Sequence, residues 1–310
     1  MRRHLSMLVT GTAAAMIGVL VAASSAEVNA GPSGAAGRPV NLLSADPNAI
    51  PQAPALVPLP GASPDAAINL DVRAKEAASE AAQDGADISF TLLDRSTGKI
   101  LTGGDDVPFP VASVSKLFIA DDLLMQVANG ERQLSPDEQQ AFDVMLRSSD
   151  DSSAEVFWGE GGGNAIISRV NARYGLSSTS APYDGNWWNT MSTTADLVRY
   201  YNMLLDGAGG LPAAQAAVIL GDLSASTPTG VDGYPQRFGI PDGLFAEPVA
   251  VKQGWMCCWN GGNWLHMSTG VIGPDRRFVL AMASLQPVDD ATARDTMTQA
   301  VKTMFPGGRI

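Results

Sequence analysis

The stretch VASVSKLFIA, Val111–Ala120, is the part of the sequence around which the fold is predicted. It places Ser113 and Lys116 three residues apart at the start of an apolar, helix-forming run. Residues at i and i+3 share one helix face, and helical side chains lean toward the N-terminus, so the Lys116 amine is expected to point back at the Ser113 hydroxyl. A serine is a weak nucleophile until a base takes its proton, and a lysine of lowered pKa can be that base. The pattern therefore indicates a serine nucleophile, although so short a pattern also occurs by chance on core helices.

Two further polar motifs follow along the chain. MLRSSDD, Met145–Asp151, closes a predicted helix, and VAVKQGW, Val249–Trp255, places Lys252 on a predicted strand. Each motif has a plainer interpretation, because the first could be a helix end followed by an N-cap and Lys252 could be a surface residue on an edge strand. Their order after the S-x-x-K pattern favours one shared site.

Taken together, the three motifs resemble those of the penicillin-recognising serine hydrolases, S-x-x-K, S-D-N and K-T-G. The chain resembles the class A β-lactamase-like family over about residues 66–310. The first motif is intact. The other two carry one substitution each, with Asp151 where the family has asparagine and Gln253 where it has threonine.

The resemblance implies a catalytic role for each residue. Ser113 would attack an acyl carbonyl and form an acyl-enzyme, while Lys116 takes or relays its proton. Ser149 would pass a proton to the leaving nitrogen, and Lys252 would be a fixed cation in the cleft, able to bind a substrate carboxylate. The backbone N–H groups of Ser113 and Trp255 would form the oxyanion hole.

The resemblance also implies substrate contacts for Asp151, Gln253 and Gly254. An aspartate at position 151 keeps a hydrogen-bond acceptor but loses the NH₂ donors of asparagine, and its charge is expected to raise the pKa of Lys116. The amide of Gln253 could replace the family's hydroxyl in holding a substrate carboxylate.

The deacylation machinery of the family is incomplete in this sequence. Class A β-lactamases use a glutamate through a water, in a loop before the helix predicted after Ser192. Between Gly175 and Ser192 the only acidic residue is Asp184, and no E-x-x-x-N pattern occurs. We therefore expect weak β-lactam turnover. Four tryptophans could line a peptide or glycan site or belong to the core: Trp187, Trp188, Trp255 and Trp259.

Other catalytic chemistries lack the residues they need. A Ser-His-Asp triad requires a histidine, and after export only His266 would remain, in a predicted strand where a packed role is more common. No G-x-S-x-G pattern occurs. Cys257, Cys258 and His266 do not have the spacing of zinc ligands. We therefore expect no metal and no cofactor.

The adjacent cysteines leave two alternatives open. Exported proteins meet oxidising conditions, but adjacent Cα atoms lie closer together than most disulfides allow. A strained vicinal disulfide between Cys257 and Cys258 and a pair of free, buried thiols are both compatible with the sequence.

The hydrophobic patterns predict an α/β (α+β) fold. An antiparallel sheet of about five strands would be flanked by N- and C-terminal helices, with an all-helical subdomain inserted at about residues 113–220. The predicted strands are Ile88–Asp94, Lys99–Thr102, Pro248–Trp255, Trp264–Ile272 and Arg277–Leu285. The predicted helices are Asp71–Gln83, one from Ser113, one ending at about Arg147 after a capping box at Ser135–Glu138, one ending near Tyr174, Ala195–Leu205, Pro212–Leu220 and Asp290–Phe305.

The first 65 residues are predicted to be an export signal followed by a linker. Two arginines precede an uncharged, apolar run and small residues, which is typical of a secretory signal peptide at residues 1–30. An uncleaved membrane anchor is the alternative. No cysteine occurs there, so a lipid-anchored lipoprotein is not indicated. Residues 31–65 are rich in Pro, Gly and Ala and are predicted to be a linker to the domain at 66–310.

The sequence as a whole thus predicts an exported, cell-envelope serine hydrolase. Its substrate would be a small molecule or peptide, such as a D-alanyl peptide of peptidoglycan, a β-lactam or a related amide or ester. The net charge of −12 argues against nucleic acid as a partner. The alternative is a catalytically silent module that keeps the fold to bind a cell-envelope component.

Overall fold

The computed structural model describes residues 64–310. The predicted signal peptide, residues 1–30, and the predicted linker up to residue 63 lie outside the described residues. No helix within 64–310 is both long and apolar enough to cross a membrane.

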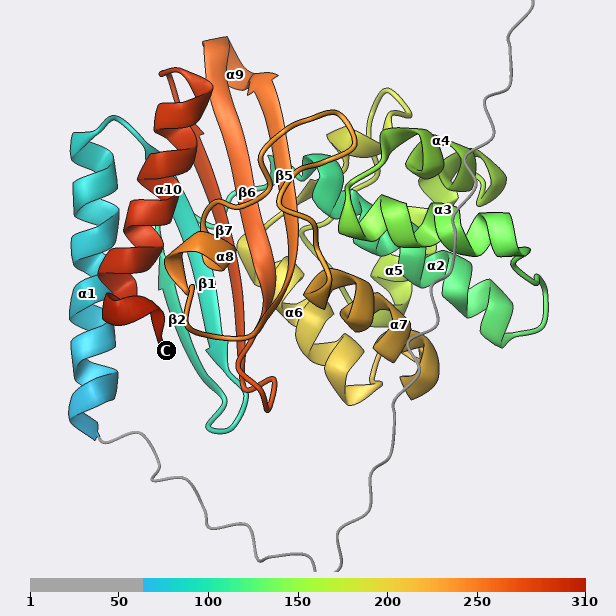
Figure 1. Cartoon of the computed structure of the whole chain (residues 1–310), viewed down its shortest axis with the longest axis horizontal. Coiled ribbons are helices and arrows are strands. Elements are labelled where there is room, and N and C mark those ends of the chain that lie inside the picture. Colours follow the sequence, from blue (N-terminus) through green and yellow to red (C-terminus); the bar gives the residue numbers. More distant parts are fainter. Residues whose placement is uncertain (1–63) are drawn as a thin grey trace, which may run out of the picture. The chain divides into compact units, whose positions relative to one another are not determined.

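A five-stranded antiparallel sheet is the frame of the domain (Figure 1). Its strand order is β2-β1-β7-β6-β5, so the first two strands of the chain pair with the last three, and β5 forms one edge. This confirms the predicted fold class, and each predicted strand is found within a few residues of its expected ends. The strands of this sheet are β1 (Asp87–Asp94), β2 (Lys99–Gly103), β5 (Val249–Cys258), β6 (Asn263–Ile272) and β7 (Phe278–Gln286).

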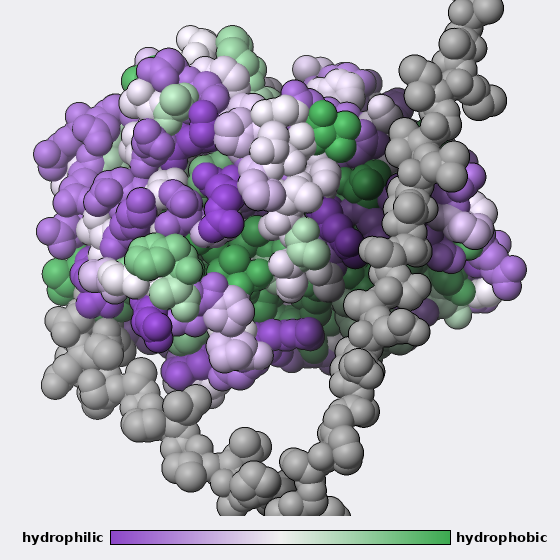
Figure 2. Space-filling view, in the orientation of Figure 1, coloured by the Kyte–Doolittle hydropathy of each residue, from purple (hydrophilic) through white to green (hydrophobic). Residues whose placement is uncertain are grey.

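Two terminal helices cover one face of the sheet. Helix α1 (Pro64–Gln83) lies beside α10 (Asp290–Met304) in Figure 1, and both pack on the sheet. Ala77 of α1, Phe90 of β1 and Met297 of α10 share one buried apolar cluster. Figure 2 shows mostly hydrophilic residues on the outer side of these two helices. The helices therefore form an amphipathic layer between the sheet and solvent.

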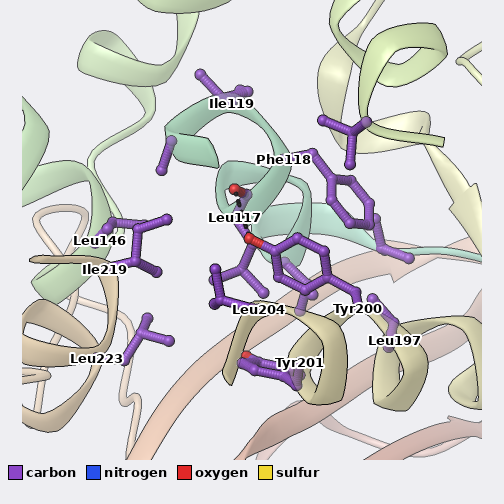
Figure 3. Close-up of a cluster of buried hydrophobic side chains, with 14 of the residues drawn as sticks. Leu117, Phe118, Ile119, Leu146, Leu197, Tyr200, Tyr201, Leu204, Ile219 and Leu223 are labelled. Carbon is purple, nitrogen blue, oxygen red and sulfur yellow. Dashed lines mark hydrogen bonds between the residues drawn. The ribbon is translucent and has the colours of Figure 1, made fainter. Parts of the chain in front are cut away.

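The other face of the sheet packs against a helical layer. Its core joins α2, α6 and α7, and Figure 3 shows Leu117 and Phe118 of α2 beside Tyr200 and Leu204 of α6. Phe118 and Tyr200 meet edge to face with ring centroids 5.3 Å apart, and the Tyr200 hydroxyl donates to the Leu117 carbonyl at 3.3 Å. The helices and short elements of this part are η1 (Ala112–Ser115), α2 (Lys116–Ala128), α3 (Pro136–Arg147), α4 (Asp151–Glu160), α5 (Asn164–Tyr174), η2 (Trp187–Asn189), α6 (Thr194–Asp206) and α7 (Ala213–Ser224), with a two-stranded ribbon of β3 (Phe109–Pro110) and β4 (Met191–Ser192).

Local capping signals account for the helix ends. Ser135 and Glu138 form the predicted capping box of α3, with Pro136 at its first position. Gly207 ends α6 in the left-handed conformation. Helix α4 was not predicted. It begins directly after the Ser149 motif, where the Asp150 side chain accepts from the Ser153 N–H. The remaining short elements are α8 (Ile240–Gly243), α9 (Trp259–Gly262) and η3 (Pro306–Gly308).

Candidate active site

Ser113 and Lys116 lie together where the helical layer meets the sheet. Ser113 belongs to the 3₁₀ turn η1, and Lys116 is the first residue of α2. The Lys116 Nζ atom lies 2.8 Å from Ser113 Oγ. Lys116 is fully buried, whereas Ser113 is 7% exposed. The predicted contact between nucleophile and amine is therefore present, with the hydroxyl open to the cleft.

Ser149 joins the two lysines of the site. Its carbonyl accepts from Lys116 Nζ at 2.7 Å, and its Oγ lies 3.2 Å from the same nitrogen. Lys252 Nζ donates to Ser149 Oγ at 2.9 Å. Residues from η1, from α2, from the α3–α4 junction and from β5 thus form one hydrogen-bonded chain, Ser113–Lys116–Ser149–Lys252.

Backbone geometry at the α3–α4 junction explains the position of Ser149. Asp150 caps α4, and Ser149 before it adopts φ = 56°, a left-handed conformation that is uncommon for a residue with a side chain. Ala112, next to Ser113, has φ = 46°. Unfavourable backbone conformations thus occur beside both serines of the site, and such outliers cluster at functional sites.

Burial dominates the electrostatics of Lys116. Its pKa is lowered by desolvation, although Asp151 Oδ1, 2.5 Å from Nζ, acts in the opposite direction. The expected effect of Asp151 is present, but it is smaller than the effect of burial. Lys252 is also buried, and desolvation together with the nearby charge of Lys116 places its pKa well below the ordinary value. Both amines are therefore shifted toward the neutral form.

Gln253 does not face the cleft. Strand alternation turns its side chain to the face opposite Lys252, where Nε2 donates to the Phe238 carbonyl at 2.6 Å and Oε1 accepts from Ser268 Oγ at 3.0 Å. Gln253 is 2% exposed. The expectation that its amide holds a substrate carboxylate was wrong, because both ends of the amide are bonded inside the protein.

Gly254 allows the edge strand β5 to approach the turn η1, which holds Ser113. A Cβ atom at this position would lie 2.6 Å from the Val111 carbonyl oxygen. Ser113 lies in the first turn of η1, where N–H groups have no partner within the helix. The oxyanion hole of the Ser113 and Trp255 N–H groups stays a prediction that this edge-to-turn contact supports.

Ser113, at one end of the chain Ser113–Lys116–Ser149–Lys252, lines a cleft of about 120 Å³. Asp232, in the loop between α7 and α8, had no signal in the sequence because it belongs to no motif. Trp259 is not part of the lining. The lining residues are Ala112, Ser113, Asp151, Trp187, Trp188, Asp232, Trp255 and Met256.

Trp187 covers Lys116. The Lys116 Nζ atom lies 4.6 Å from the centroid of the Trp187 ring, and the indole is 2% exposed, with its N–H donated to Glu155. Asp184 forms an exposed turn in the same loop, where its carboxylate accepts from Asn186 and Asn189 and these bonds lower its pKa. An apolar ring therefore lies beside the lysine, and Asp184 does not line the cleft.

Trp255 is held from behind by a buried polar cluster. Its ring stacks on Tyr234 with centroids 4.3 Å apart. The Tyr234 hydroxyl lies 2.7 Å from His266 Nε2 and donates to Asp290. Burial lowers the pKa of His266 to about 4. His266 is thus a packed strand residue that supports one wall of the cleft.

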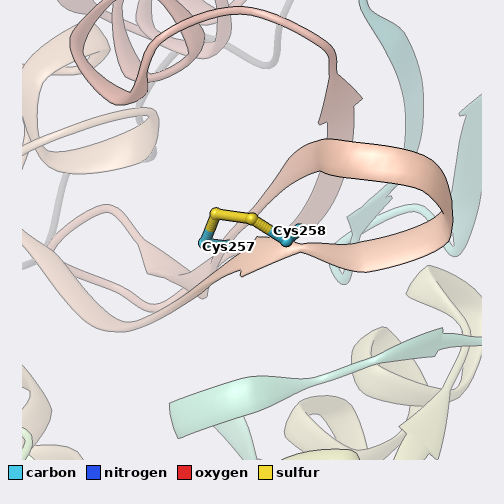
Figure 4. Close-up of a disulfide and its surroundings, with 2 residues drawn as sticks. All are labelled: Cys257 and Cys258. Carbon is cyan, nitrogen blue, oxygen red and sulfur yellow. A yellow bond between two sulfur atoms is a disulfide. The ribbon is translucent and has the colours of Figure 1, made fainter.

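Cys257 and Cys258 form a disulfide at the end of β5 (Figure 4). Both residues are exposed, so the alternative of two free, buried thiols was wrong. They directly follow Met256 of the cleft lining. Within residues 64–310, no cluster of three or more His, Cys, Asp or Glu side chains could hold a metal ion.

Comparisons with known proteins concern the family and the fold of this chain. Residues 71–143 match the model of a family described as "Beta-lactamase enzyme family". A protein of Mycobacterium tuberculosis H37Rv named "Putative lipoprotein LppW" is 61% identical over 252 residues, which cover 81% of this chain and 80% of that protein. The chain belongs to the β-lactamase enzyme family.

Two solved structures show the same fold. A mutant of PBP-A, described as an acyl-enzyme complex with penicillin G, has a TM-score of 0.63 and 18% identity, covering 77% of this chain and 95% of that one. A β-lactamase from Chitinophaga pinensis has a TM-score of 0.61 and 15% identity, covering 76% and 98%. At such low identity the likeness concerns the fold that β-lactamases share.

Proposed function

We propose that this member of the β-lactamase family is an exported serine hydrolase that forms an acyl-enzyme on Ser113. The observation that carries the proposal is the contact of 2.8 Å between Lys116 Nζ and Ser113 Oγ, with Lys116 buried and its pKa lowered. A neutral amine at that distance is within reach of the hydroxyl proton. The substrate class is a D-alanyl peptide, a β-lactam or a related amide or ester.

The hydrogen-bonded chain supplies a route for the proton. Neutral Lys116 takes the proton of Ser113 Oγ as that oxygen attacks the acyl carbonyl. Lys116 Nζ also lies 3.2 Å from Ser149 Oγ, so the proton can pass through Ser149 to the leaving group as the acyl bond breaks. Lys252, bonded to Ser149 Oγ at 2.9 Å, holds this hydroxyl in place.

Release of the acyl group is expected to be slow on β-lactams. Hydrolysis needs an activated water, and a general base typically contributes about 10²–10⁴-fold. The Trp187 indole lies beside Lys116, and Asp184 lies in an exposed turn outside the cleft lining. A mutant of PBP-A, which shares the fold, was captured as a penicillin acyl-enzyme. A long-lived acyl-enzyme is therefore expected here as well.

Probe labelling tests the acyl-enzyme directly. The mature domain is incubated with a fluorescent penicillin, a reactive ester and a fluorophosphonate, and its intact mass is measured. We expect one adduct on the wild-type protein and on Ser168→Ala, whose exposed hydroxyl lies on α5, and none on Ser113→Ala. No adduct on the wild type with any of the probes would refute the proposal.

A second candidate is a catalytically silent module that binds a cell-envelope component. The close ion pair of Lys116 with Asp151 and the covering Trp187 favour it, because both hinder the lysine as a base. A Ser113→Ala protein that fully restores the phenotype of a deletion strain would support this candidate. Loss of function in a folded Ser113→Ala protein would count against it.

Export is part of the proposal. The relative LppW is named as a lipoprotein, and lipoproteins are exported to the envelope. The two cysteines of the sequence, Cys257 and Cys258, are joined in a disulfide. We propose a secreted or envelope-associated protein that leaves through its signal peptide.

A further inference from the structure

We propose that Tyr234 is a positioning residue for acylation, because it fixes the Trp255 wall of the cleft relative to Ser149. That role rests on the proposed acyl-enzyme function and adds a residue to the same site. Tyr234 belongs to the loop of residues 227–236, which is called the strap below. The strap contacts the Ser149 side of the cleft, the Trp255 side and the helix α10.

The strap binds the end of α3 directly before Ser149. Carbonyl groups in the last turn of a helix have no partner within the helix, and the strap supplies partners for two of them. The Arg147 carbonyl accepts from the buried amide of Gln236 at 3.0 Å. The Ser148 carbonyl accepts from the Val231 N–H at 2.8 Å. Because Ser149 is the next residue, the strap is bonded to the backbone that carries this serine.

The other side of the strap packs on Trp255. The Tyr234 and Trp255 rings stack with their planes 6° apart and their centroids 4.3 Å apart. Gly230 lies between the two sides, since a Cβ atom there would be 3.4 Å from the Ser148 carbonyl oxygen and 3.6 Å from Trp255 Cη2. The Gly230 N–H donates to the Tyr234 carbonyl at 2.8 Å and closes the turn. One short turn therefore sets the spacing between the two sides of the cleft.

The Tyr234 hydroxyl anchors the strap to the sheet and to α10. It lies 2.7 Å from His266 Nε2 of β6 and donates to Asp290 of α10. Arg294 lies over the Tyr234 ring, 5.4 Å from its centroid, and pairs with Asp290 at 3.1 Å. Both the ring and the hydroxyl of Tyr234 are thus engaged. The stacked Trp255 indole is expected to keep one orientation for the same reason.

The orientation of Trp255 matters for acylation because Trp255 and Ser113 line the same cleft. The indole limits where an acyl group can lie beside the Ser113 hydroxyl. A misplacement of reacting atoms by about 1 Å can cost about 10²-fold in rate. Loss of the Tyr234 ring should therefore slow acylation more than it weakens binding.

Single-turnover acylation by a fluorescent penicillin tests this role. Tyr234→Leu should lower the rate at saturating probe about tenfold and change the half-saturating concentration by no more than about twofold. Tyr234→Phe keeps the ring and loses the hydroxyl anchor, so its rate should fall only about threefold. Tyr183→Leu is the matched control and should equal the wild type, because Tyr183 is 85% exposed and does not line the cleft.

An unchanged rate at saturation in a folded Tyr234→Leu protein would overturn the inference. A change in the half-saturating concentration alone would overturn it too, because the ring would then contribute equally to the bound state and the transition state. Urea unfolding shows whether each variant is folded. If Tyr234→Leu does not fold, Tyr234→Phe decides, with the threefold loss supporting the role and a wild-type rate contradicting it.

Fluorine NMR separates this inference from the acyl-enzyme proposal. The protein is labelled with 5-fluorotryptophan, and Trp255→Phe identifies the Trp255 resonance. In Tyr234→Leu this resonance should broaden or split, because the indole is no longer held in one orientation, and in Tyr183→Leu it should stay as in the wild type. That result supports the inference even if no probe acylates Ser113, an outcome that would refute the acyl-enzyme alone. A resonance as sharp in Tyr234→Leu as in the wild type counts against the role of Tyr234 whatever the acylation result.

Discussion

Replacing Asp151 by asparagine should make Lys116 a better base. The Asp151 carboxylate is the strongest single influence that keeps Lys116 protonated, because its Oδ1 lies 2.5 Å from Nζ. Asparagine keeps an oxygen that can accept from Lys116 but removes the charge. Asp150 remains as the cap of α4, so the helix start is preserved.

The size of the effect follows from the exposure of the pair. Two unit charges 4 Å apart interact by about 1 kcal/mol in water and about 4 kcal/mol near a protein surface. The Asp151 side chain is 71% exposed, so solvent screens the pair and the lower end applies. A loss of about 1.4 kcal/mol of this attraction lowers the pKa of Lys116 further and gives about tenfold more neutral amine on the acid side of the profile.

The assay is the pH dependence of acylation by a reactive ester or fluorescent penicillin under single-turnover conditions. In Asp151→Asn the acid limb of the rate profile should move down by about one pH unit, and the rate on that limb should rise about tenfold. Asp295→Asn, which removes an exposed carboxylate on α10, should leave the profile in place. An unmoved limb, or one displaced to higher pH, would refute the role of Lys116 as the base.

Three further outcomes are expected. A chromogenic cephalosporin should leave a persistent acyl-enzyme with kcat below about 1 s⁻¹, and Asp184→Asn should not change its decay, because Asp184 does not line the cleft. Turnover at about 1–10³ s⁻¹ would show that a general base does activate the deacylating water. Replacing Cys257 and Cys258 by serine should lower the free energy of unfolding in urea by only about 1 kcal/mol, since the disulfide closes the shortest of loops; a loss of several kcal/mol would show a larger role. The pKa of His266 is about 4 in the folded protein and 6.5 in the unfolded chain. As the pH drops from 6.5 to 4, the unfolded state therefore binds a proton that the folded state does not. The free energy of unfolding falls by up to about 3 kcal/mol over this range. His266→Gln should lack this part of the pH dependence, and an unchanged slope would show that His266 is not the titrating group.

Much of the frame could be predicted from local patterns. Apolar-rich runs bounded by turn residues located the five strands, because burial on both faces of β1, β6 and β7 leaves a signal in each segment by itself. The capping box at Ser135 and the stop at Gly207 marked helix ends for the same reason. The pair Ser113 and Lys116 was predictable as well, since i, i+3 spacing in a helical turn fixes the contact with no help from the rest of the chain.

Features that depend on distant segments were missed or misjudged. Asp232 lies in the cleft only because a loop after α7 returns to it, and no neighbour in sequence indicates this. Gln253 was assigned to the cleft by motif position. Its place on β5 instead directs the side chain to the other face of the sheet, where it donates to the Phe238 carbonyl. Helix α4 is short and polar at its start, so its pattern was weak.

The sequence by itself determined the strands, most of the helices and the contact of Ser113 with Lys116, because these depend on spacing within single segments. Only the tertiary structure decided how Ser149 and Lys252 join that pair and which charges face the cleft. It also decided whether the pKa of Lys116 is lowered or raised. Burial lowers the pKa of this lysine more than Asp151 raises it. Desolvation is a property of everything packed around a group, so no local stretch of residues could reveal it.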